Sequence, residues 1–334
     1  MGLCAPAATT PLSRPTPPAA FWPLADAGAR AAYAGLLAES AQRTPFSDLP
    51  FADAACATFG LTGHLLLAGG DAPDAGLVVF EKRRGPLRAA ALPPYAEFVT
   101  PVLRAPLRAT DVHRGASPLD DVAAALTGRV HQASLRLHPT LADPRPLAWA
   151  GWSLRTAYHM EAPIEGEGGT GAWGRYTRKD VRRHAESFEV REGRGEVGAV
   201  VALAEGSMRS KGLGHPPAAA CARLARALVD AGQARAFVAV DDGGPQAGAV
   251  VALGDETAFY WMVGSQPGPA MTVLLAHVAR EVQAAGVRRL HLGGANVASV
   301  AEFKRGFGGE LVPVVRARYV WGRLLRLRDA WAGR

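Results

Sequence analysis

Two segments of the 334-residue chain repeat one pattern of apolar and turn residues. HLLLAGGDAPDAGLVV (64–79) aligns without a gap on AFVAVDDGGPQAGAVV (236–251), so the offset is 236 − 64 = 172 residues. The identical pairs are Pro73/Pro245, Ala75/Ala247, Gly76/Gly248, Val78/Val250 and Val79/Val251. Each copy has an apolar strand, a polar turn with glycine and proline, and a second apolar strand, which is the pattern of a β-hairpin. The repeat therefore predicts that one architecture occurs twice in the chain.

The elements expected around the two hairpins follow a similar order. In the first half we expect helices over 28–40 and 50–58, strand-like material over 87–103 and a helix over 118–129. In the second half we expect helices over 197–209, 217–231, 270–285 and 299–309, and strands over 257–265, 288–294 and 310–321. The order α-α-β-β-β-α-β-α-β indicates an α/β fold, in which a mixed, mostly antiparallel sheet is flanked by helices, in two copies.

The length also favours two subdomains, because single hydrophobic cores rarely grow beyond about 250–300 residues. A frayed leader is expected over residues 1–20, followed by subdomains over 21–160 and 161–334. The boundary is expected between Trp149 and Trp173, because the stretch IEGEGGTGAWGRY (164–176) has five glycines and few apolar residues, as is typical of a connecting segment.

Composition limits the class of protein. The hydrophobic fraction of 49% and charged fraction of 20% indicate a globular chain, and the net charge of +7 would attract phosphates or other polyanions. The three cysteines are far apart, so neither a disulfide framework nor a cysteine zinc site is expected. The sequence shows neither a secretory signal nor an apolar run of about 20 residues, so we expect a cytoplasmic protein.

The second half resembles the GNAT-fold domain of the Fem-type aminoacyltransferases and their acyltransferase relatives. The resemblance is carried by GAVVALGDETAFYWMVGS, a helix ending in AAG, RRLHLGGA and AEFKRGFGGE, and most specifically by the F-K-x-x-F-G element of Phe303, Lys304, Phe307 and Gly308. LADPRPLAWAGW, RTAYHM and RYTRKDVRRHAESFEVREG are similar to the same group, so the resemblance spans roughly residues 45–321. It implies two tandem GNAT-like subdomains and transfer of an amino acid from aminoacyl-tRNA to a peptidoglycan precursor.

Two departures from the related families concern the acyl donor. No long heptad-patterned stretch is present that could form the helical hairpin often carried by peptidoglycan-bridge enzymes. At the position where acetyl-CoA-dependent GNAT enzymes hold a pyrophosphate, GSQPGPAMTV has Pro267 and Pro269, each of which removes a backbone donor. Both donors, aminoacyl-tRNA and acyl-CoA, therefore stay open, and no other cofactor is expected.

Three residues are expected to act in catalysis. By resemblance, Phe303 and Lys304 line the acyl-transfer channel, where an ammonium would stabilise the negative oxygen of the tetrahedral intermediate. The alternative is an ordinary solvated lysine on an amphipathic helix. His291, on the strand before Gly293, is the candidate base, and the alternative is a packed strand histidine. The acceptor amine is itself the nucleophile, so no serine or cysteine nucleophile is needed.

Substrate binding is expected from a basic helix and three tyrosines. Arg175, Arg178, Lys179 and Arg182 share one helical face, which could meet a diphosphate or an RNA backbone, although such runs are usually solvated surface. Tyr176, Tyr95 and Tyr260 complete the set; Tyr95 could equally be a packed loop aromatic. The nine histidines show neither an H-x-x-x-H nor an H-E-x-x-H arrangement, so no metal is expected.

These patterns favour an N-acyltransferase or aminoacyltransferase acting on an amine of a cell-envelope precursor of the peptidoglycan type. The expected partner is a small-molecule or nucleotide-linked amine, and tRNA is a further partner in the case that aminoacyl-tRNA is the acyl donor. An acetyl-CoA-dependent GNAT N-acetyltransferase and a catalytically inactive GNAT-like binding protein are the alternatives. The sequence does not specify the oligomeric state.

Overall fold

The computed structural model describes residues 19–107 and 117–322, so most of the expected leader lies outside the described residues. The predicted repeat is present as a repeated topology. The first half contains α1 (Ala27–Glu39), α2 (Leu49–Phe59), β2 (Thr62–Ala68), β3 (Ala75–Arg84), β4 (Leu87–Ala90), α4 (Pro118–Arg129) and β6 (Gln132–Arg136). The second half contains α7 (Val197–Ser210), α8 (Ala218–Asp230), β9 (Ala234–Asp241), β10 (Gly244–Leu253), β11 (Thr257–Ser265), α9 (Ala270–Ala284) and β12 (Arg289–Gly294).

Strand pairing repeats together with the order of elements. In each half the first two strands form an antiparallel hairpin, β2 with β3 and β9 with β10. The third strand pairs antiparallel with the second, and it pairs parallel with the strand that follows the helix, β4 with β6 and β11 with β12. The expected mixed, mostly antiparallel fold is therefore confirmed in both copies.

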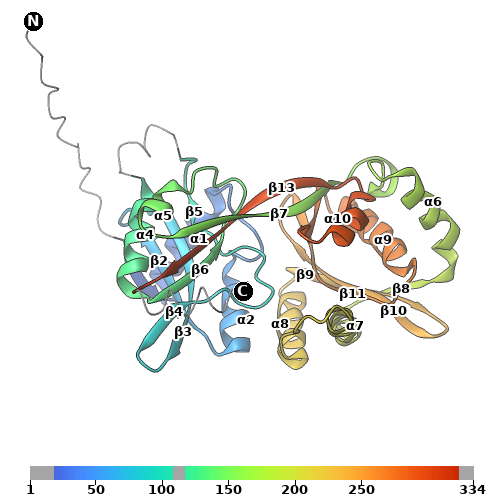
Figure 1. Ribbon diagram of the computed structural model, residues 1–334, viewed down its shortest axis with the longest axis horizontal. Helices are drawn as coiled ribbons and strands as arrows, with labels where there is room; N and C mark the ends of the chain where they lie inside the picture. Colours follow the sequence, from blue (N-terminus) through green and yellow to red (C-terminus); the bar gives the residue numbers. More distant parts are fainter. Residues whose placement is uncertain (1–18, 108–116, 323–334) are drawn as a thin grey trace, which may run out of the picture.

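The last strand of each half pairs with the other half. After β6, the chain passes through α5 (Arg145–Trp149) into β7 (Ser153–Pro163), which pairs with β12 of the second half. After β12, the chain passes through α10 (Ala298–Arg305) into β13 (Glu310–Val320), which pairs with both β6 and β7. Figure 1 shows β7 and β13 running side by side across both halves. The predicted boundary after residue 160 falls inside β7 and stays a prediction.

All the named strands belong to one sheet of thirteen strands. Its order is β1-β2-β3-β4-β6-β13-β7-β12-β11-β10-β9-β8, with β5 (Val102–Leu103) paired to β3. β1 (Ala20–Pro23) and β8 (Glu189–Glu192) are the outer strands of this order. The remaining helix, α6 (Arg175–His184), packs beside α9.

Helices cover both faces of the sheet in the second half. Residues of α7 and α8, including Val200 and Leu224, pack in one core cluster with residues of the first half. The apolar stripe of α9, including Leu274 and Val278, packs in a second cluster on the other face. Figure 1 shows this separation, with α7 and α8 below the sheet and α9 above it. No helix within the described ranges is both long and apolar enough to cross a membrane.

Candidate active site at the junction of the two halves

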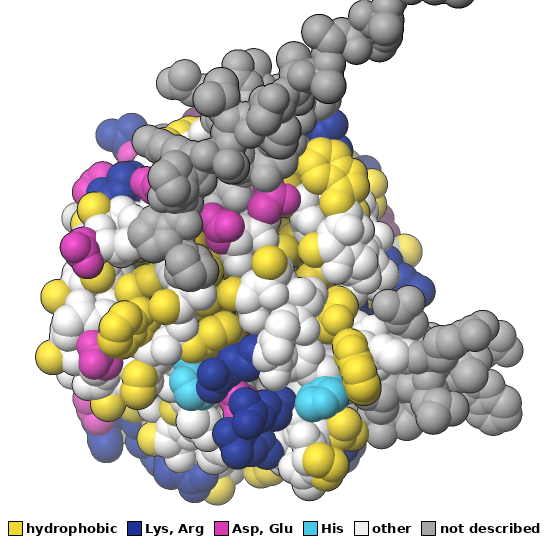
Figure 2. Space-filling model, turned by 90° about the vertical axis from the view of Figure 1, so that its left-hand side faces the viewer, with side chains coloured by type: hydrophobic (Ala, Val, Ile, Leu, Met, Phe, Trp, Pro, Cys, Tyr) yellow, Lys and Arg dark blue, Asp and Glu magenta, His cyan; other side chains and the backbone are white. Residues whose placement is uncertain are grey.

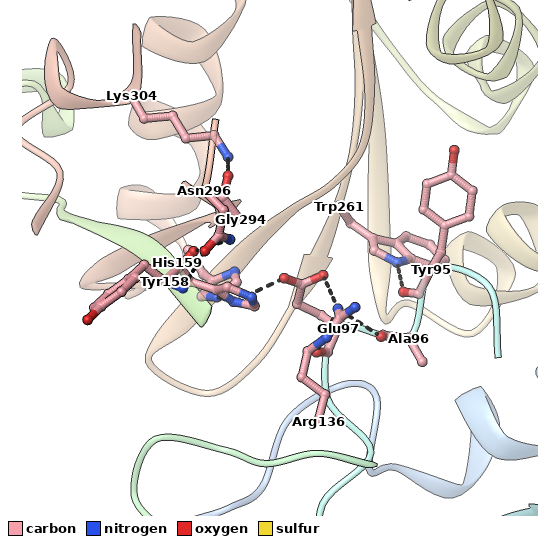
Figure 3. A network of polar contacts seen from close by, with 11 residues as sticks. Tyr95, Ala96, Glu97, Arg136, Tyr158, His159, Trp261, Gly294, Asn296 and Lys304 are labelled. Carbon is pink, nitrogen blue, oxygen red and sulfur yellow. Dashed lines mark hydrogen bonds and ion pairs between the residues drawn. The ribbon is translucent and has the colours of Figure 1, made fainter. Parts of the chain in front are cut away.

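Lys304 is the one buried residue of α10 and lies in its last turn. Its side chain is 8% exposed, and its Nζ donates a hydrogen bond of 2.7 Å to the carbonyl oxygen of Gly294 at the end of β12 (Figure 3). Burial lowers its pKa to about 8, against the opposing attraction of Glu97. The alternative of a solvated lysine is therefore excluded for this side chain.

Glu97, His159 and His291 form a polar cluster beside Lys304. His159 Nδ1 lies 3.0 Å from His291 Nε2 and 3.2 Å from Glu97 Oε1. Both histidines are 1% exposed, and Glu97 keeps 21% of its side chain exposed. A Cβ added at Gly293 would lie 3.8 Å from both Glu97 Oε1 and Lys304 Nζ, so the cluster and the ammonium border the same space.

The protonation of this cluster follows from its burial. Burial and the charge of Arg136 lower the pKa of His159 to about 3, and burial lowers the pKa of His291 well below its ordinary value. Both rings are therefore neutral at pH 7. Burial raises the pKa of Glu97, although Arg136 acts in the opposite direction.

Arg136 fixes Glu97 from the β6 side. Its Nη1 donates to Glu97 Oε2 at 3.2 Å and to the backbone oxygens of Ala96 and Glu97 at 3.3 and 3.1 Å (Figure 3). The Nε of the same guanidinium is buried and has no hydrogen-bond partner among the described residues. Burying a donor without a hydrogen-bond partner costs free energy. The Nε of Arg136 is therefore an unused polar group of the site.

Tyr95 brings the first half against the second. Its φ of 62° is the only positive φ at a non-glycine residue within the described ranges, and such conformations persist where surrounding contacts over-determine them. Trp261 Nε1 donates to the Tyr95 carbonyl at 2.6 Å, and the Tyr95 hydroxyl lies 2.7 Å from His215 Nε2. The loop that carries Tyr95 and Glu97 is thus held on β11 and on the segment after α7.

The other predicted residues lie outside this cluster. Phe303 is 41% exposed, and its ring packs on Phe307, which in turn packs on Trp173. Tyr260 packs in the second core cluster, whereas its neighbours Phe259 and Trp261 pack in the first. The roles predicted for Phe303 and Tyr260 stay predictions.

The predicted basic stripe forms the surface of α6, a helix without buried residues. Arg175, Lys179 and Arg182 are exposed and Tyr176 is 82% exposed, whereas Arg178 Nη1 donates to the Gly171 carbonyl at 2.8 Å. The helix begins beside α10, because Gly174 N donates to the carbonyl oxygen of Gly306 at 2.9 Å. Phosphate contact by this stripe stays a prediction.

Another charged group lies in the first half. Figure 2 shows Lys and Arg side chains gathered beside histidines on the outer face of the molecule. In this half the fully buried carboxylate of Glu81 pairs with Arg83 at 2.8 Å and with Arg129 at 3.1 Å, and His64 lies 3.6 Å away. These partners satisfy Glu81 internally, which indicates a structural role.

A cavity of about 700 Å³ lies between α7 and the loop before α9. Its lining includes Ser207, Ser210, Lys211, Gln266 and Pro267. Lys211, one of the lining residues, is among the charges that lower the pKa of Lys304, after burial as the largest cause. A volume of this size is in the range of small-molecule sites.

Glu97, His159 and Arg136 are not among the residues predicted from the sequence. They come from a loop, from β7 and from β6, and no local spacing connects them. The available signals were weak: a glutamate after Tyr95 in PPYAEF, and a histidine in the otherwise apolar end of RTAYHM.

Comparison with known proteins identifies the fold. The family described as Acetyltransferase (GNAT) domain matches residues 174–305, which include Lys304 and His291. A search of the curated proteins gave no match.

Solved structures match over most of the chain. The crystal structure of FemX matches with a TM-score of 0.62 at 10% identity, covering 86% of this chain and 95% of FemX. A tandem GNAT protein from the clavulanic acid biosynthesis pathway matches with a TM-score of 0.57 at 14% identity, covering 91% and 99%. L-PGS from Bacillus licheniformis matches with a TM-score of 0.52 at 11% identity, covering 89% and 93%. The chain therefore has a tandem GNAT-like fold similar to those of FemX and the tandem GNAT protein, and the matched GNAT domain lies in its second half.

Proposed function

We propose that the protein is an N-acyltransferase or aminoacyltransferase that acylates an amine of a cell-envelope precursor of the peptidoglycan type. The observation that carries this proposal is the buried Lys304 ammonium, which faces the junction of the two halves rather than solvent. The GNAT match and the FemX-like fold support acyl transfer as the class of reaction. The acceptor, the cytoplasmic location and the subdomain limits 21–160 and 161–334 belong to the same proposal.

Lys304 can supply the electrostatic part of acyl transfer. An ammonium has three N–H donors, and the Gly294 carbonyl occupies one of them. The remaining donors have no hydrogen-bond partner within residues 19–107 and 117–322, so they can meet the oxygen that becomes negative in the tetrahedral intermediate. Because the side chain is buried, this interaction is stronger than it would be in water. With a pKa of about 8, Lys304 is mostly protonated at neutral pH.

The other predicted site residues surround this group. Phe303 precedes Lys304 and offers an exposed aromatic face on α10 for the acyl donor. The basic stripe of α6 begins beside the end of α10, where it would meet the phosphates of aminoacyl-tRNA or of a nucleotide-linked acceptor. His291 stays the predicted base, although its buried ring would need Glu97, the more exposed member of the cluster, to connect it to a substrate.

A matched pair of variants tests the proposal. Purified protein would be supplied with radiolabelled aminoacyl-tRNA or acyl-CoA and a mixture of amine-bearing cell-wall precursors, and the acylated product identified by mass spectrometry. Lys304→Ala should lower the rate by about 100-fold, as loss of one oxyanion donor does. Arg305→Ala should keep the rate, because that neighbour is 77% exposed. Binding of the precursor with equal affinity by wild type and Lys304→Ala, without turnover by either, would instead show an inactive binding protein.

One observation favours an acetyl-CoA-dependent N-acetyltransferase as the second candidate. The cavity beside α7 ends at Gln266 and Pro267, directly before α9, where GNAT enzymes place the donor. Against this, the N-cap position of α9 is Pro269 and offers no side-chain hydrogen bond. Saturable micromolar binding of acetyl-CoA in a calorimetric titration would favour this candidate, and absence of binding would favour aminoacyl-tRNA.

A further inference from the structure

Three ligand-type atoms converge on one point at the junction of the two halves. One ligand atom from each of Glu97, His159 and His291 lies within 4.8 Å of the other two. They belong to the loop after β4, to β7 and to β12, so the tertiary fold brings them together. Glu97 is the member that reaches solvent, and the two rings are buried behind it.

The hydrogen atoms available do not satisfy all three atoms. His159 Nδ1 contacts both other atoms, at 3.2 and 3.0 Å, and this nitrogen carries either a hydrogen or a lone pair. If His159 Nδ1 carries a hydrogen, that single hydrogen is shared between two acceptors, the Glu97 carboxylate and the lone pair of His291 Nε2. With a lone pair, His159 Nδ1 accepts one hydrogen, either from His291 Nε2 or from a protonated Glu97, so only one of its two contacts is satisfied. A cation placed between the three atoms satisfies every lone pair at once.

We propose that Glu97, His159 and His291 bind one divalent transition-metal ion, with zinc as the reference case. Zinc bonds to histidine nitrogen and carboxylate oxygen are about 2.0–2.2 Å long, which in tetrahedral geometry places neighbouring ligand atoms roughly 3.3–3.6 Å apart. The observed separations of 3.0 and 3.2 Å are slightly shorter, so the three side chains would move apart by a few tenths of an ångström to coordinate the ion. Two imidazoles and one carboxylate form a donor set that suits zinc, iron or cobalt.

The surroundings support a site with an open position. Arg136 Nη1 orients the carboxylate from its other oxygen, as supporting residues do at metal centres. Three protein ligands leave room for a water or substrate atom, and Gly293 places no side chain on the side facing Lys304.

Neighbouring charge selects the kind of ion. Arg136 and Lys304 lie beside Glu97, and both repel a cation. Magnesium and calcium depend on several charged oxygen ligands and should not bind here. Zinc forms bonds to two neutral imidazoles, and the positive charges of Arg136 and Lys304 weaken these bonds less than they weaken bonds to charged oxygen ligands. His291 cannot act as a base while its Nε2 is coordinated, so metal binding and the predicted base role exclude each other.

Metal titration of the full chain tests the inference without any substrate. Protein stripped with a chelator would be titrated with zinc chloride by calorimetry, and with cobalt(II) while its visible absorption is recorded. We expect one ion per chain, a higher Tm with zinc and no binding of magnesium or calcium. Glu97→Gln and His159→Ala should each weaken zinc binding by at least about 100-fold, since loss of a mere supporting residue costs about 10–100-fold.

His131→Ala is the matched control, because this histidine lies between α4 and β6 and its Nδ1 accepts from the Arg88 amide. It should bind zinc as the wild type does. Circular dichroism of each variant establishes folding. If His159→Ala fails to fold, Glu97→Gln still tests the inference, because it keeps the size of the side chain. The inference is overturned if the wild type binds no zinc, if Glu97→Gln binds it unchanged, or if His131→Ala loses it equally.

Discussion

At the scale of single residues, Lys304 is a charge that the fold holds at a cost. A buried ammonium loses its hydration, and one backbone carbonyl at 2.7 Å replaces only part of it. Lowering the pKa from 10.5 to about 8 corresponds to at most about 3 kcal/mol, since each pKa unit is worth about 1.4 kcal/mol. A residue that served stability alone would not be a buried ammonium with this free-energy cost, so the position of Lys304 favours a functional role.

Lys304→Met should therefore stabilise the protein at neutral pH. The folded pKa lies below the unfolded pKa, so the cost is fully present below pH 8 and is relieved as the pH rises from about 8 to 10.5. We expect the free energy of unfolding of Lys304→Met to exceed that of the wild type at pH 7 by up to about 3 kcal/mol, less about 1 kcal/mol for the lost hydrogen bond. Urea denaturation at pH 7 and pH 10 measures the difference, which should shrink at pH 10. A variant less stable than wild type at pH 7 would contradict the argument.

Three of the residues predicted from the sequence lie at this junction. Lys304 belongs to a recognisable motif, His291 is a lone histidine in a predicted strand, and Tyr95 was predicted from the family resemblance. Glu97 and His159 were not predicted, because their significance depends on which strands become neighbours. A histidine in one strand gains a partner only when β7 pairs with β12, and no spacing along the chain contains that information.

At the scale of elements, local signals define the helices well. The predicted helix over 118–129 coincides with α4, which Ser117 and Asp120 start with a capping box. Both hairpins are also confirmed, because an apolar strand, a turn and a second strand form a local unit. The exchange of β7 and β13 between halves could not be predicted, since no local pattern in either strand specifies which half it pairs with.

The packing of α7 on the sheet provides a prediction for one glycine. A Cβ at Gly264 on β11 would lie 2.2 Å from the backbone carbon of Leu203, so Gly264→Ala must displace α7 from the sheet. We expect a loss of roughly 1–3 kcal/mol in the free energy of unfolding, as overpacking causes. Gly206→Ala in α7 itself is the control: its added Cβ meets nothing within 4 Å, and it should gain about 0.5–1 kcal/mol. Chemical denaturation of both variants measures the contrast, and equal effects would contradict it.

At the scale of the whole molecule, the strand exchange joins two similar halves into one sheet. β13 completes the first half through β6, and β7 completes the second half through β12. Separating the halves would therefore expose the hydrogen-bonding edges of both, which is unfavourable for strands that are otherwise paired. The candidate site lies where the halves meet, because Glu97 comes from one half and Lys304 from the other.

This arrangement predicts that the two halves unfold together. Leu119 in α4 is fully buried in the first half, and Leu119→Ala should lower the free energy of unfolding by about 2–5 kcal/mol. If the sheet is one cooperative unit, the slowest-exchanging amides of β9 and β10 in the second half should lose protection by the same free energy. Hydrogen exchange followed by mass spectrometry measures this, and Val238→Ala in β9 gives the reciprocal test on β2 and β3. Retained protection in the distant half would mean that the halves are independent domains, and that β7 and β13 connect them without coupling their stability.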